Sequence, residues 1–297
     1  YSEAEVLLSV ATERSRTDLY ANFRYPLTSV EKATFKKLVF WRIQGFPLQY
    51  LAGTQTFRYL KLKITPGVFI PRPETELLVE QAIETIRNLP RTTQKAPSVK
   101  TGMNAFTFSR SETPQSHTRK GVVRGLPQPV TAIDLGTGSG AIALSLAYEI
   151  PAVHVYAVDI STKALELAAE NAIFHNLRDR ISFIQSDLFK NLGKELIERA
   201  DLIVANPPYI PAPALNDLPI EVQREPRIAL DGGSDGLIFY RRIIKDAPRY
   251  LKVSGYLVFE VGMGQAGPVA GLLKDTGAFE EIEIFKDYAG IERIVKG

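Results

Sequence analysis

The sequence predicts an α/β protein with a mostly parallel sheet, and two observations carry this prediction. From about residue 130 onward, short apolar segments of strand character alternate with segments of helical periodicity. This alternation is typical of a parallel sheet covered by helices on both faces. A glycine-rich turn follows the first of these strands. Such sheets bind ligands outside the carboxyl ends of their strands, so residues that follow a strand are the candidates for function.

The first fifty residues are expected to form a small helical domain. Two apolar stripes at helical spacing support this, one of Val6, Leu7, Val10 and Ala11 and the other including Ala33, Leu38, Trp41 and Ile43. Thr28 and Glu31 have the spacing of a capping box that begins a helix. A region of this size buries too little surface to be stable alone, so we expect it to pack on the rest of the chain.

The next segments combine a strand pattern, a helix pattern and a region without a period. Residues 57–64 alternate apolar and basic side chains, as a half-buried strand does. Gly67 and the prolines at 71 and 73 interrupt the chain, and residues 74–89 have the period of an amphipathic helix. Residues 90–129 are rich in Thr, Ser, Pro, Gln and Arg. We expect a flexible insertion there, because this composition buries too little apolar surface to offset its ordering entropy.

Charge is concentrated in that insertion. It holds seven Lys or Arg residues and one acidic residue, Glu112, and therefore carries +6. Since the whole chain has a net charge of +3, the remainder sums to −3. A mildly acidic body disfavours an enzyme that grips duplex DNA with a broad basic face.

The alternating region predicts seven strands and five helices. The strands are expected at residues 130–134, 153–158, 181–184, 202–205, 256–260, 281–285 and 293–295. The helices are expected at residues 141–147, 163–174, 192–200, 237–250 and 265–274. The chain has no Cys, which excludes disulfides, thiolate metal sites and a Cys nucleophile. Its three His residues have no ligand spacing, so no metal site is expected, and no apolar run approaches the roughly 20 residues of a membrane-spanning helix.

A nucleoside site is indicated where the strand ending at Asp134 runs into the turn at residues 136–140. Glycines let the backbone approach a ligand, and the helix after the turn offers unpaired N–H groups. Asp159 closes the next strand, where a carboxylate can accept hydrogen bonds from both ribose hydroxyls. The turn also fits the dinucleotide pattern G-x-G-x-x-A, so NAD remains open at this point. Asp134 favours a cationic ligand, because a carboxylate beside the turn would repel a pyrophosphate.

The segment Asn206-Pro207-Pro208-Tyr209 comes directly after the strand at residues 202–205 and indicates the chemistry. Neither Pro has an N–H, and Pro207 biases Asn206 toward an extended backbone. In this stiff loop the Asn206 side-chain oxygen and the Pro207 carbonyl can both accept from an NH2 group on a planar carbon, and Tyr209 can stack on that plane. These bonds would draw electron density onto the nitrogen and position it for methyl transfer. No metal or dedicated base is required.

With these motifs in place, the chain resembles the HemK/PrmC family of glutamine N5-methyltransferases, which modify the Gln of the Gly-Gly-Gln loop in class I peptide-chain release factors. Further blocks carry the resemblance: residues 46–53 (FPLQYLAG), 70–76 (IPRPETE), 186–189 (SDLF), and Glu225-Pro226 with Ala229-Leu230. They keep the family's order over nearly the whole chain outside residues 90–129. The Asn-Pro-Pro-Tyr element alone is shared with DNA adenine methyltransferases.

The resemblance implies a Rossmann-like class I methyltransferase with a seven-stranded sheet. Its parts would be a helical substrate-recognition domain at 1–53, a hairpin linker at 54–72, and an S-adenosylmethionine-dependent catalytic domain at 73–297. The residues implied for the cofactor and its product S-adenosylhomocysteine are Asp134, Gly136, Thr137, Gly138, Ser139, Gly140, Asp159, Asp187, Leu188 and Asn206. Asp159 would hold the ribose and Asp187-Leu188 would flank the adenine, although some relatives have an aromatic residue where Leu188 stands. Asn206, Pro207, Pro208 and Tyr209 would hold the target Gln, with Asn206, Pro207 and Tyr209 acting in catalysis.

The alternative is a DNA or RNA adenine-N6 methyltransferase, since the adenine amine is also a planar NH2 group. Such an enzyme must flip its base and grip phosphates, whereas here the extra domain is small and the body is not basic. A nucleoside-binding regulatory module would have no use for the Asn-Pro-Pro-Tyr loop. An NAD-dependent oxidoreductase is disfavoured by Asp134 and by the absence of an evident proton-transfer pair. We expect a monomeric cytoplasmic enzyme, with an organellar location left open, that acts on release factors without binding nucleic acid or a membrane directly.

Overall fold

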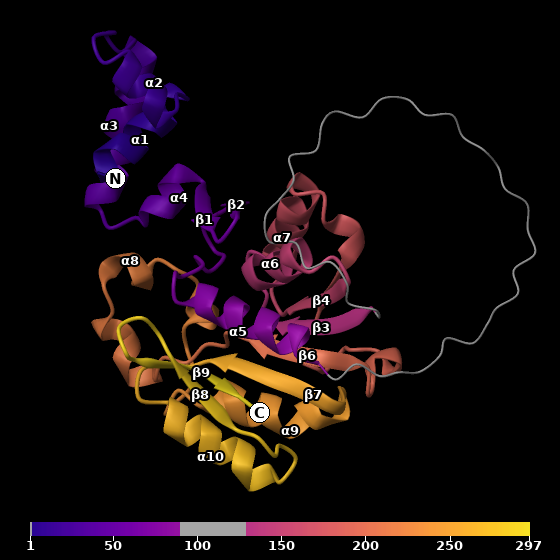
Figure 1. Ribbon diagram of the computed structural model, residues 1–297. Coiled ribbons are helices and arrows are strands. Elements are labelled where there is room, and N and C mark those ends of the chain that lie inside the picture. The colour runs from indigo at the N-terminus through magenta and orange to yellow at the C-terminus, as the bar shows by residue number, and fades with distance from the viewer. Residues whose placement is uncertain (1, 90–128) are drawn as a thin grey trace, which may run out of the picture.

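A seven-stranded sheet forms the centre of the protein in the computed structural model, which describes residues 2–89 and 129–297 (Figure 1). The expected insertion at 90–129 therefore lies, except for its last residue, outside the described residues. The strands are β3 (Val130–Leu135), β4 (Val153–Asp159), β5 (Ile181–Gln185), β6 (Ala200–Ala205), β7 (Leu251–Glu260), β8 (Glu283–Lys286) and β9 (Glu292–Lys296). Their order is β5-β4-β3-β6-β7-β9-β8. Strands β3 to β7 pair in parallel and β9 runs antiparallel to β7 and β8, so the expected mostly parallel sheet is confirmed.

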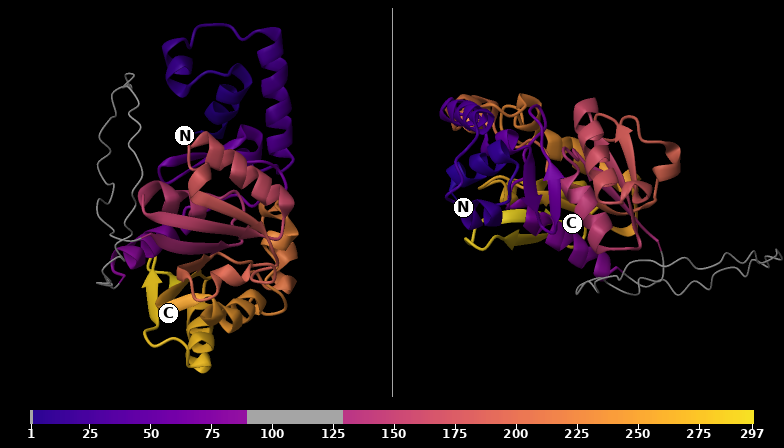
Figure 2. Two further views of the ribbon diagram at one scale, coloured as in Figure 1. Left: turned by 90° about the vertical axis from the view of Figure 1, so that its right-hand side faces the viewer. Right: turned by 90° about the horizontal axis from the view of Figure 1, so that it is seen from above.

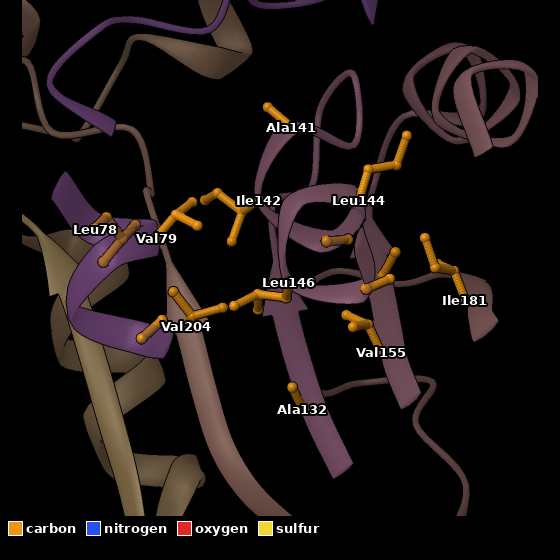
Figure 3. Close-up of a cluster of buried hydrophobic side chains, with 14 of the residues drawn as sticks. Leu78, Val79, Ala132, Ala141, Ile142, Leu144, Leu146, Val155, Ile181 and Val204 are labelled. Atoms are coloured by element: carbon orange, nitrogen blue, oxygen red, sulfur yellow. The ribbon is translucent and has the colours of Figure 1, made fainter. Parts of the chain in front are cut away.

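Helices cover both faces of this sheet. On one face lie α5 (Thr75–Arg87), α6 (Ala141–Glu149) and α7 (Thr162–Phe174), and on the other α9 (Ile238–Asp246) and α10 (Ala266–Thr276) (Figure 1). Successive strand residues point to opposite faces. Ala132 therefore joins the core under α5 and α6, while Ile133 joins the core under α9 and α10. In Figure 3, Val79 of α5 points toward Ile142 of α6, above Val204 of β6.

The prediction of a helix at residues 192–200 is wrong. Only Lys194–Leu196 is helical, as a single 3₁₀ turn, and β6 already begins at Ala200. The apolar spacing that suggested a helix arises because Leu192, Leu196 and Ala200 are all buried in the core. The backbone N–H groups of residues 198–200 instead donate to the carbonyls of Arg249 and Tyr250, which places this segment beside the residues that precede β7.

The connection from β6 to α9 is long and holds α8 (Ile220–Gln223) between the 3₁₀ turns Ala212–Asp217 and Arg227–Ala229. Further 3₁₀ turns lie at Arg178–Arg180 and at Ala247–Arg249, where the helix expected to reach residue 250 ends earlier. Among the described residues, no helix combines the length and apolar character needed to cross a membrane.

The N-terminal region is helical, as expected. It contains α1 (Glu3–Thr12), α2 (Arg16–Ala21), α3 (Ser29–Ile43) and α4 (Leu48–Ala52). The capping box is confirmed: Thr28 Oγ1 accepts from the Glu31 N–H at 3.2 Å, and Glu31 Oε2 accepts from the Thr28 N–H at 2.7 Å. The stripe expected on α3 is wrong in part, because Ala33, Trp41 and Ile43 are exposed and Leu38 alone of the four is partly buried. The inward face instead includes Phe35, Leu38 and Val39, each partly buried.

Residues 57–64 do not form one strand as expected. Strands β1 (Thr54–Phe57) and β2 (Leu60–Lys63) make a hairpin with its turn at residues 58–59. Arg58 has a φ of 49° and holds the turn: its N–H donates to Glu76 Oε1 at 3.0 Å, and its guanidinium donates to both oxygens of Glu149. The alternation of apolar and basic residues continues across the turn because Phe57, Leu60 and Leu62 are all buried in the same core.

The helical region packs against the long β6–α9 connection. Arg42 of α3 donates to Glu221 Oε1 of α8 at 2.6 Å and also pairs with Glu3. Arg224 donates to the Gln44 carbonyl at 3.2 Å, and its guanidinium lies 4.8 Å from the Phe46 ring centroid. Figure 2 shows the N-terminal helices at one end of the molecule and α10 toward the opposite end. The connection that begins with the Asn-Pro-Pro-Tyr loop is thereby tied to the N-terminal helices.

Candidate active site

The glycine turn between β3 and α6 leaves space for a ligand. Gly136 and Gly138 have φ values of 76° and 57°, and a Cβ built on either residue would meet no atom within 4 Å. Gly140, at the N-cap of α6, is different. A Cβ there would lie 2.4 Å from Leu144 Cδ1 and 3.1 Å from Ala168 Cβ. The first two glycines therefore border open space, whereas Gly140 allows α6 and α7 to pack closely.

Asp134 lies beneath this turn and is fully buried. Its Oδ2 accepts from the Thr137 hydroxyl at 2.7 Å and from the Ala143 N–H at 3.1 Å. Its Oδ1 has no hydrogen-bond partner among the described residues. Burial raises the pKa of Asp134 to about 7, against the opposing effect of these hydrogen bonds. Asp134 supports the turn from below and does not line the cavity beside it.

Asp159, at the carboxyl end of β4, lies across from the turn. Its Oδ2 accepts from the Gly138 N–H and its Oδ1 from the Ser161 N–H, each at 2.9 Å. Burial raises the pKa of this carboxyl, and the backbone hydrogen bonds oppose the rise. A carboxylate oxygen can accept more than one hydrogen bond, so each oxygen retains capacity for a hydroxyl donor.

The Asn-Pro-Pro-Tyr loop begins where β6 ends. Asn206 Nδ2 donates to Thr75 Oγ1 at 3.1 Å, which turns the amide nitrogen toward the start of α5. Asn206, Pro207 and Pro208 line the cavity. Tyr209 does not: it packs against the core under α9 and α10, and Gln265 Nε2 donates to its carbonyl at 2.9 Å. Stacking of Tyr209 on a substrate stays a prediction.

Asp187 and Leu188 come after β5 and form another wall. Leu188 has a φ of 54°, a left-handed conformation that is uncommon for a branched side chain. Asp187 Oδ1 pairs with Arg242 of α9 at 2.7 Å. Arg242 and Phe239 line the same cavity, so α9 contributes a wall that the sequence did not suggest.

These segments surround one cavity of about 300 Å³. The expected residues that line it are Gly136, Thr137, Gly138, Ser139, Asp159, Asp187, Leu188, Asn206, Pro207 and Pro208. Asp134, Gly140 and Tyr209 were expected at the site and lie outside this lining.

Sequence reasoning missed the wall formed by Phe69 and Pro71 before α5, by Thr75 at the start of α5, and by Pro226 and Ile228. The blocks at residues 70–76 and 225–230 were a signal for most of these. Glu225 ties the two segments together. It is 5% exposed, accepts from the Ile70 N–H at 3.0 Å, and pairs with Arg72.

Known proteins share this chain's sequence over almost its whole length. The family described as PrmC N-terminal domain matches residues 1–53, and the family described as Methyltransferase small domain matches residues 120–217. The release factor glutamine methyltransferase of Geobacter sulfurreducens is 40% identical over 296 residues, which is 99% of this chain and 88% of that protein. The release factor glutamine methyltransferase of Moorella thermoacetica is 39% identical over 292 residues, 98% of this chain and 88% of that protein.

Solved structures share the fold at lower identity. The hMettl16 catalytic domain, in complex with MAT2A 3'UTR hairpin 6, has a TM-score of 0.55 at 16% identity, over 80% of this chain and 74% of that one. The human methyltransferase 10 domain containing protein has a TM-score of 0.50 at 17% identity, over 88% of this chain and 98% of that one. These likenesses concern the fold alone, whereas the identity to the bacterial relatives extends from the N-terminal helices to β9. The chain belongs to the release factor glutamine methyltransferases, a family of S-adenosylmethionine-dependent enzymes.

Proposed function

We propose that this enzyme transfers the methyl group of S-adenosylmethionine to the side-chain amide nitrogen of the Gln in the Gly-Gly-Gln loop of class I release factors. The observation that carries the proposal is the orientation of Asn206. Because its Nδ2 donates to Thr75, its amide oxygen is left to accept from a target beside the glycine turn. The full-length identity to release factor glutamine methyltransferases supports this target.

The residues at the turn fit the cofactor. The open space beside Gly136 and Gly138 is a cradle that any side chain would fill. Asp159, with spare acceptor capacity on each oxygen, would hold the ribose hydroxyls. Asp187 and Leu188 line the part of the cavity that we assign to the adenine. When bound, the cofactor supplies an electrophilic methyl group on a cationic sulfur, and the buried carboxyl of Asp134 lies on the side of the turn away from the cavity.

On the substrate side, the loop would orient a poor nucleophile. An amide nitrogen has a delocalised lone pair, and its two N–H groups need acceptors. The Asn206 side-chain oxygen and the Pro207 carbonyl would accept from them, and Pro207 and Pro208 bring no N–H groups that compete. Such bonds strengthen as the nitrogen becomes positive in the transition state, so they favour the chemical step over simple binding. The N-terminal helices, tied to the loop's connection by Arg42 and Arg224, are proposed to help recognise the release factor.

An adenine-N6 methyltransferase would use the same loop, and the experiment must distinguish the two targets. The enzyme would be incubated with labelled S-adenosylmethionine and, separately, a class I release factor, a release factor whose Gly-Gly-Gln Gln is replaced by Asn, duplex DNA and RNA. We expect label only in the unaltered release factor, and peptide mass mapping should place it on that Gln. Label in nucleic acid, or equal label in both release factors, would contradict the proposed function.

A further inference from the structure

A buried carboxyl stands behind Asn206 and is not part of the cavity lining. Glu260 ends β7, the strand beside β6, where Ala205 pairs with Phe259, so Glu260 and Asn206 leave the sheet side by side. Glu260 is 2% exposed, and its Oε2 has no hydrogen-bond partner among the described residues. Such a group would not be retained in a core for packing alone, because burying an acid is unfavourable.

Glu260 is linked to the amide that meets the substrate. The side chains of Thr75 and Asn206 interact with the Glu260 carboxyl as hydrogen-bond partners. They lower the pKa of Glu260, although burial raises it by more. Asn206 Nδ2 also donates to Thr75 Oγ1 at 3.1 Å. Thr75, which is 3% exposed, thus stands between the amide and the acid at the first turn of α5.

The direction of these hydrogen bonds is set by the charge of the acid. An ionised carboxylate can only accept, so in its interaction with Glu260 the Thr75 hydroxyl takes the role of donor. Thr75 Oγ1 then remains free to accept from an N–H, and it selects the nitrogen of the Asn206 amide. The amide oxygen is consequently left for the target. If the amide were reversed, its N–H groups would meet the N–H groups of the target, and no bond would form.

We propose that Glu260 is a positioning residue that acts on the Asn206 amide, directly and through Thr75, and fixes which end of that amide faces the target nitrogen. This inference rests on the proposed function for its effect on catalysis, but it also concerns the enzyme without a protein substrate. A protonated Glu260 can donate, so Thr75 can in turn donate to the amide oxygen and the selection is lost.

The charge of Glu260 is sensitive to pH in the neutral range. Burial, with a smaller contribution from Glu74, raises its pKa to about 7 against the lowering effects of Thr75, Arg293 and Asn206. Tyr209 and Tyr240 also face Glu260, and burial raises the pKa of Tyr209 to about 12, so neither competes for protons near neutrality. As pH falls through about 7, Glu260 gains a proton, and kcat should fall with it.

The first test compares kcat with pH for the wild type and Glu260→Gln. Gln keeps the shape but both accepts and donates at every pH, so we expect kcat about 10- to 100-fold lower than the wild type at pH 8 and no acid limb near pH 7. Thr75→Ser keeps the hydroxyl and should be about tenfold faster than Thr75→Val, which removes it. Glu281→Gln, the same change at an exposed position, should retain the wild-type acid limb. Affinity for S-adenosylhomocysteine should stay within about twofold in Glu260→Gln, which also shows that the variant is folded.

The second test does not depend on methylation. In the complex with S-adenosylhomocysteine, the side-chain NH2 resonances of Asn206 should titrate with a midpoint near pH 7 in the wild type and stay constant in Glu260→Gln. Resonances that behave alike in both proteins, or a Glu260→Gln enzyme with wild-type kcat and an intact acid limb, would overturn the inference. If the wild type fails to methylate the release factor, the proposed function fails, and the resonance titration still decides the role of Glu260.

Discussion

At the end of β6, Asn206 offers a single amide oxygen to the proposed target. We therefore expect its removal to affect the rate of methyl transfer more than the binding of the cofactor. Asn206→Ala should lower kcat by about 10²–10³, the usual effect of removing one preorganised hydrogen bond. Affinity for S-adenosylmethionine should change much less, because the amide nitrogen is engaged with Thr75. Single-turnover rates and calorimetry measure the two effects separately. Asn206→Asp, which keeps an acceptor, should remain partly active, and an Asn206→Ala enzyme with the wild-type rate would remove the loop from the mechanism.

Asp134 predicts how the enzyme distinguishes its cationic cofactor from the neutral product. Its carboxyl has a pKa of about 7 because it is buried, and a cation on the other side of the turn should lower that pKa. Binding of S-adenosylmethionine should therefore release a proton near pH 7, and its affinity relative to S-adenosylhomocysteine should increase as pH rises from 6 to 8. Calorimetry in buffers of different ionisation enthalpy measures this release. In Asp134→Asn, the two ligands should no longer differ in proton release or in the pH dependence of their affinity. Equal proton release for both ligands in the wild type would contradict this role of Asp134.

At the scale of elements, the seven strands could be predicted because buried parallel strands read as short apolar segments between turns. The segment at residues 192–200 shows the limit of that reasoning. Its apolar spacing is real, but Glu198 has a φ of 56°, its N–H donates to the Arg249 carbonyl, and the next two N–H groups donate to the Tyr250 carbonyl. Partners about fifty residues away in the chain decided its conformation, and local periodicity does not report on them.

The residues of the candidate site likewise fall into those that the sequence could predict and those that depend on packing between distant elements. Asp159 and Asn206 could be predicted because each lies at the carboxyl end of a strand that the sequence shows. Glu260 also ends such a strand, and the same rule applied to residues 256–260 would have found it. Thr75 was signalled only by the block at residues 70–76, and Arg242 had no signal, because helix residues reach the cavity only through the packing of α5 and α9 on the sheet.

The contact between α3 and α8 predicts an effect of Gly45. Gly45 has a φ of 78°, and a Cβ there would lie 2.7 Å from Ile220 Cγ2. Gly53 has a φ of 70° and nothing within 4 Å of an added Cβ, so it is a matched control. Gly53→Ala should cost about 1–2 kcal/mol from backbone strain alone, and Gly45→Ala a further ~1–3 kcal/mol from the clash.

Urea unfolding of both variants measures these costs. Adding Ile220→Ala to Gly45→Ala should recover the extra cost but not the backbone strain, as a double-mutant cycle can show. If Gly45→Ala and Gly53→Ala are equally stable, the N-terminal helices do not depend on close packing against α8.

For the whole molecule, the distribution of perturbed carboxyls separates two pH ranges. Burial raises the pKa values of Asp134, Asp159, Glu225 and Glu260, which surround the cavity or the segments that form it. On the surface, ion pairs and hydrogen bonds lower the pKa values of Glu3 and Asp287, and that of Asp235 to about 2. The active site is therefore the part of the ligand-free protein that acid stabilises, while the surface is the part that acid weakens.

Proton binding determines whether the free energy of unfolding rises or falls with pH in the neutral range. Asp134 and Glu260 have folded pKa values of about 7 and ordinary values of 3.8 and 4.5, so between about pH 4 and 7 the folded protein binds more protons than the unfolded chain. Their contribution to the free energy of unfolding falls as pH rises through this range and levels off above it. At 1.36 kcal/mol per pKa unit, the full shifts correspond to about 4 kcal/mol for Asp134 and about 3 kcal/mol for Glu260. His154, whose pKa is lowered by burial, acts in the opposite direction, so the total slope is not diagnostic.

The difference between wild type and the double variant Asp134→Asn/Glu260→Gln isolates these two groups. We expect the variant to gain stability relative to the wild type as pH rises from 5 to 8, by several kcal/mol, because its amides carry no charge to bury. Urea unfolding of the ligand-free proteins at pH 5, 6, 7 and 8 measures this difference. Asp235→Asn is the control: it should differ from the wild type above its ordinary pKa and converge with it only as pH falls toward 2, since the stability from a lowered carboxyl is lost in acid. Parallel stability curves for the wild type and the double variant across pH 5–8 would mean that neither carboxyl changes charge in this range, and the pH dependence expected for cofactor binding and for catalysis would fail with it.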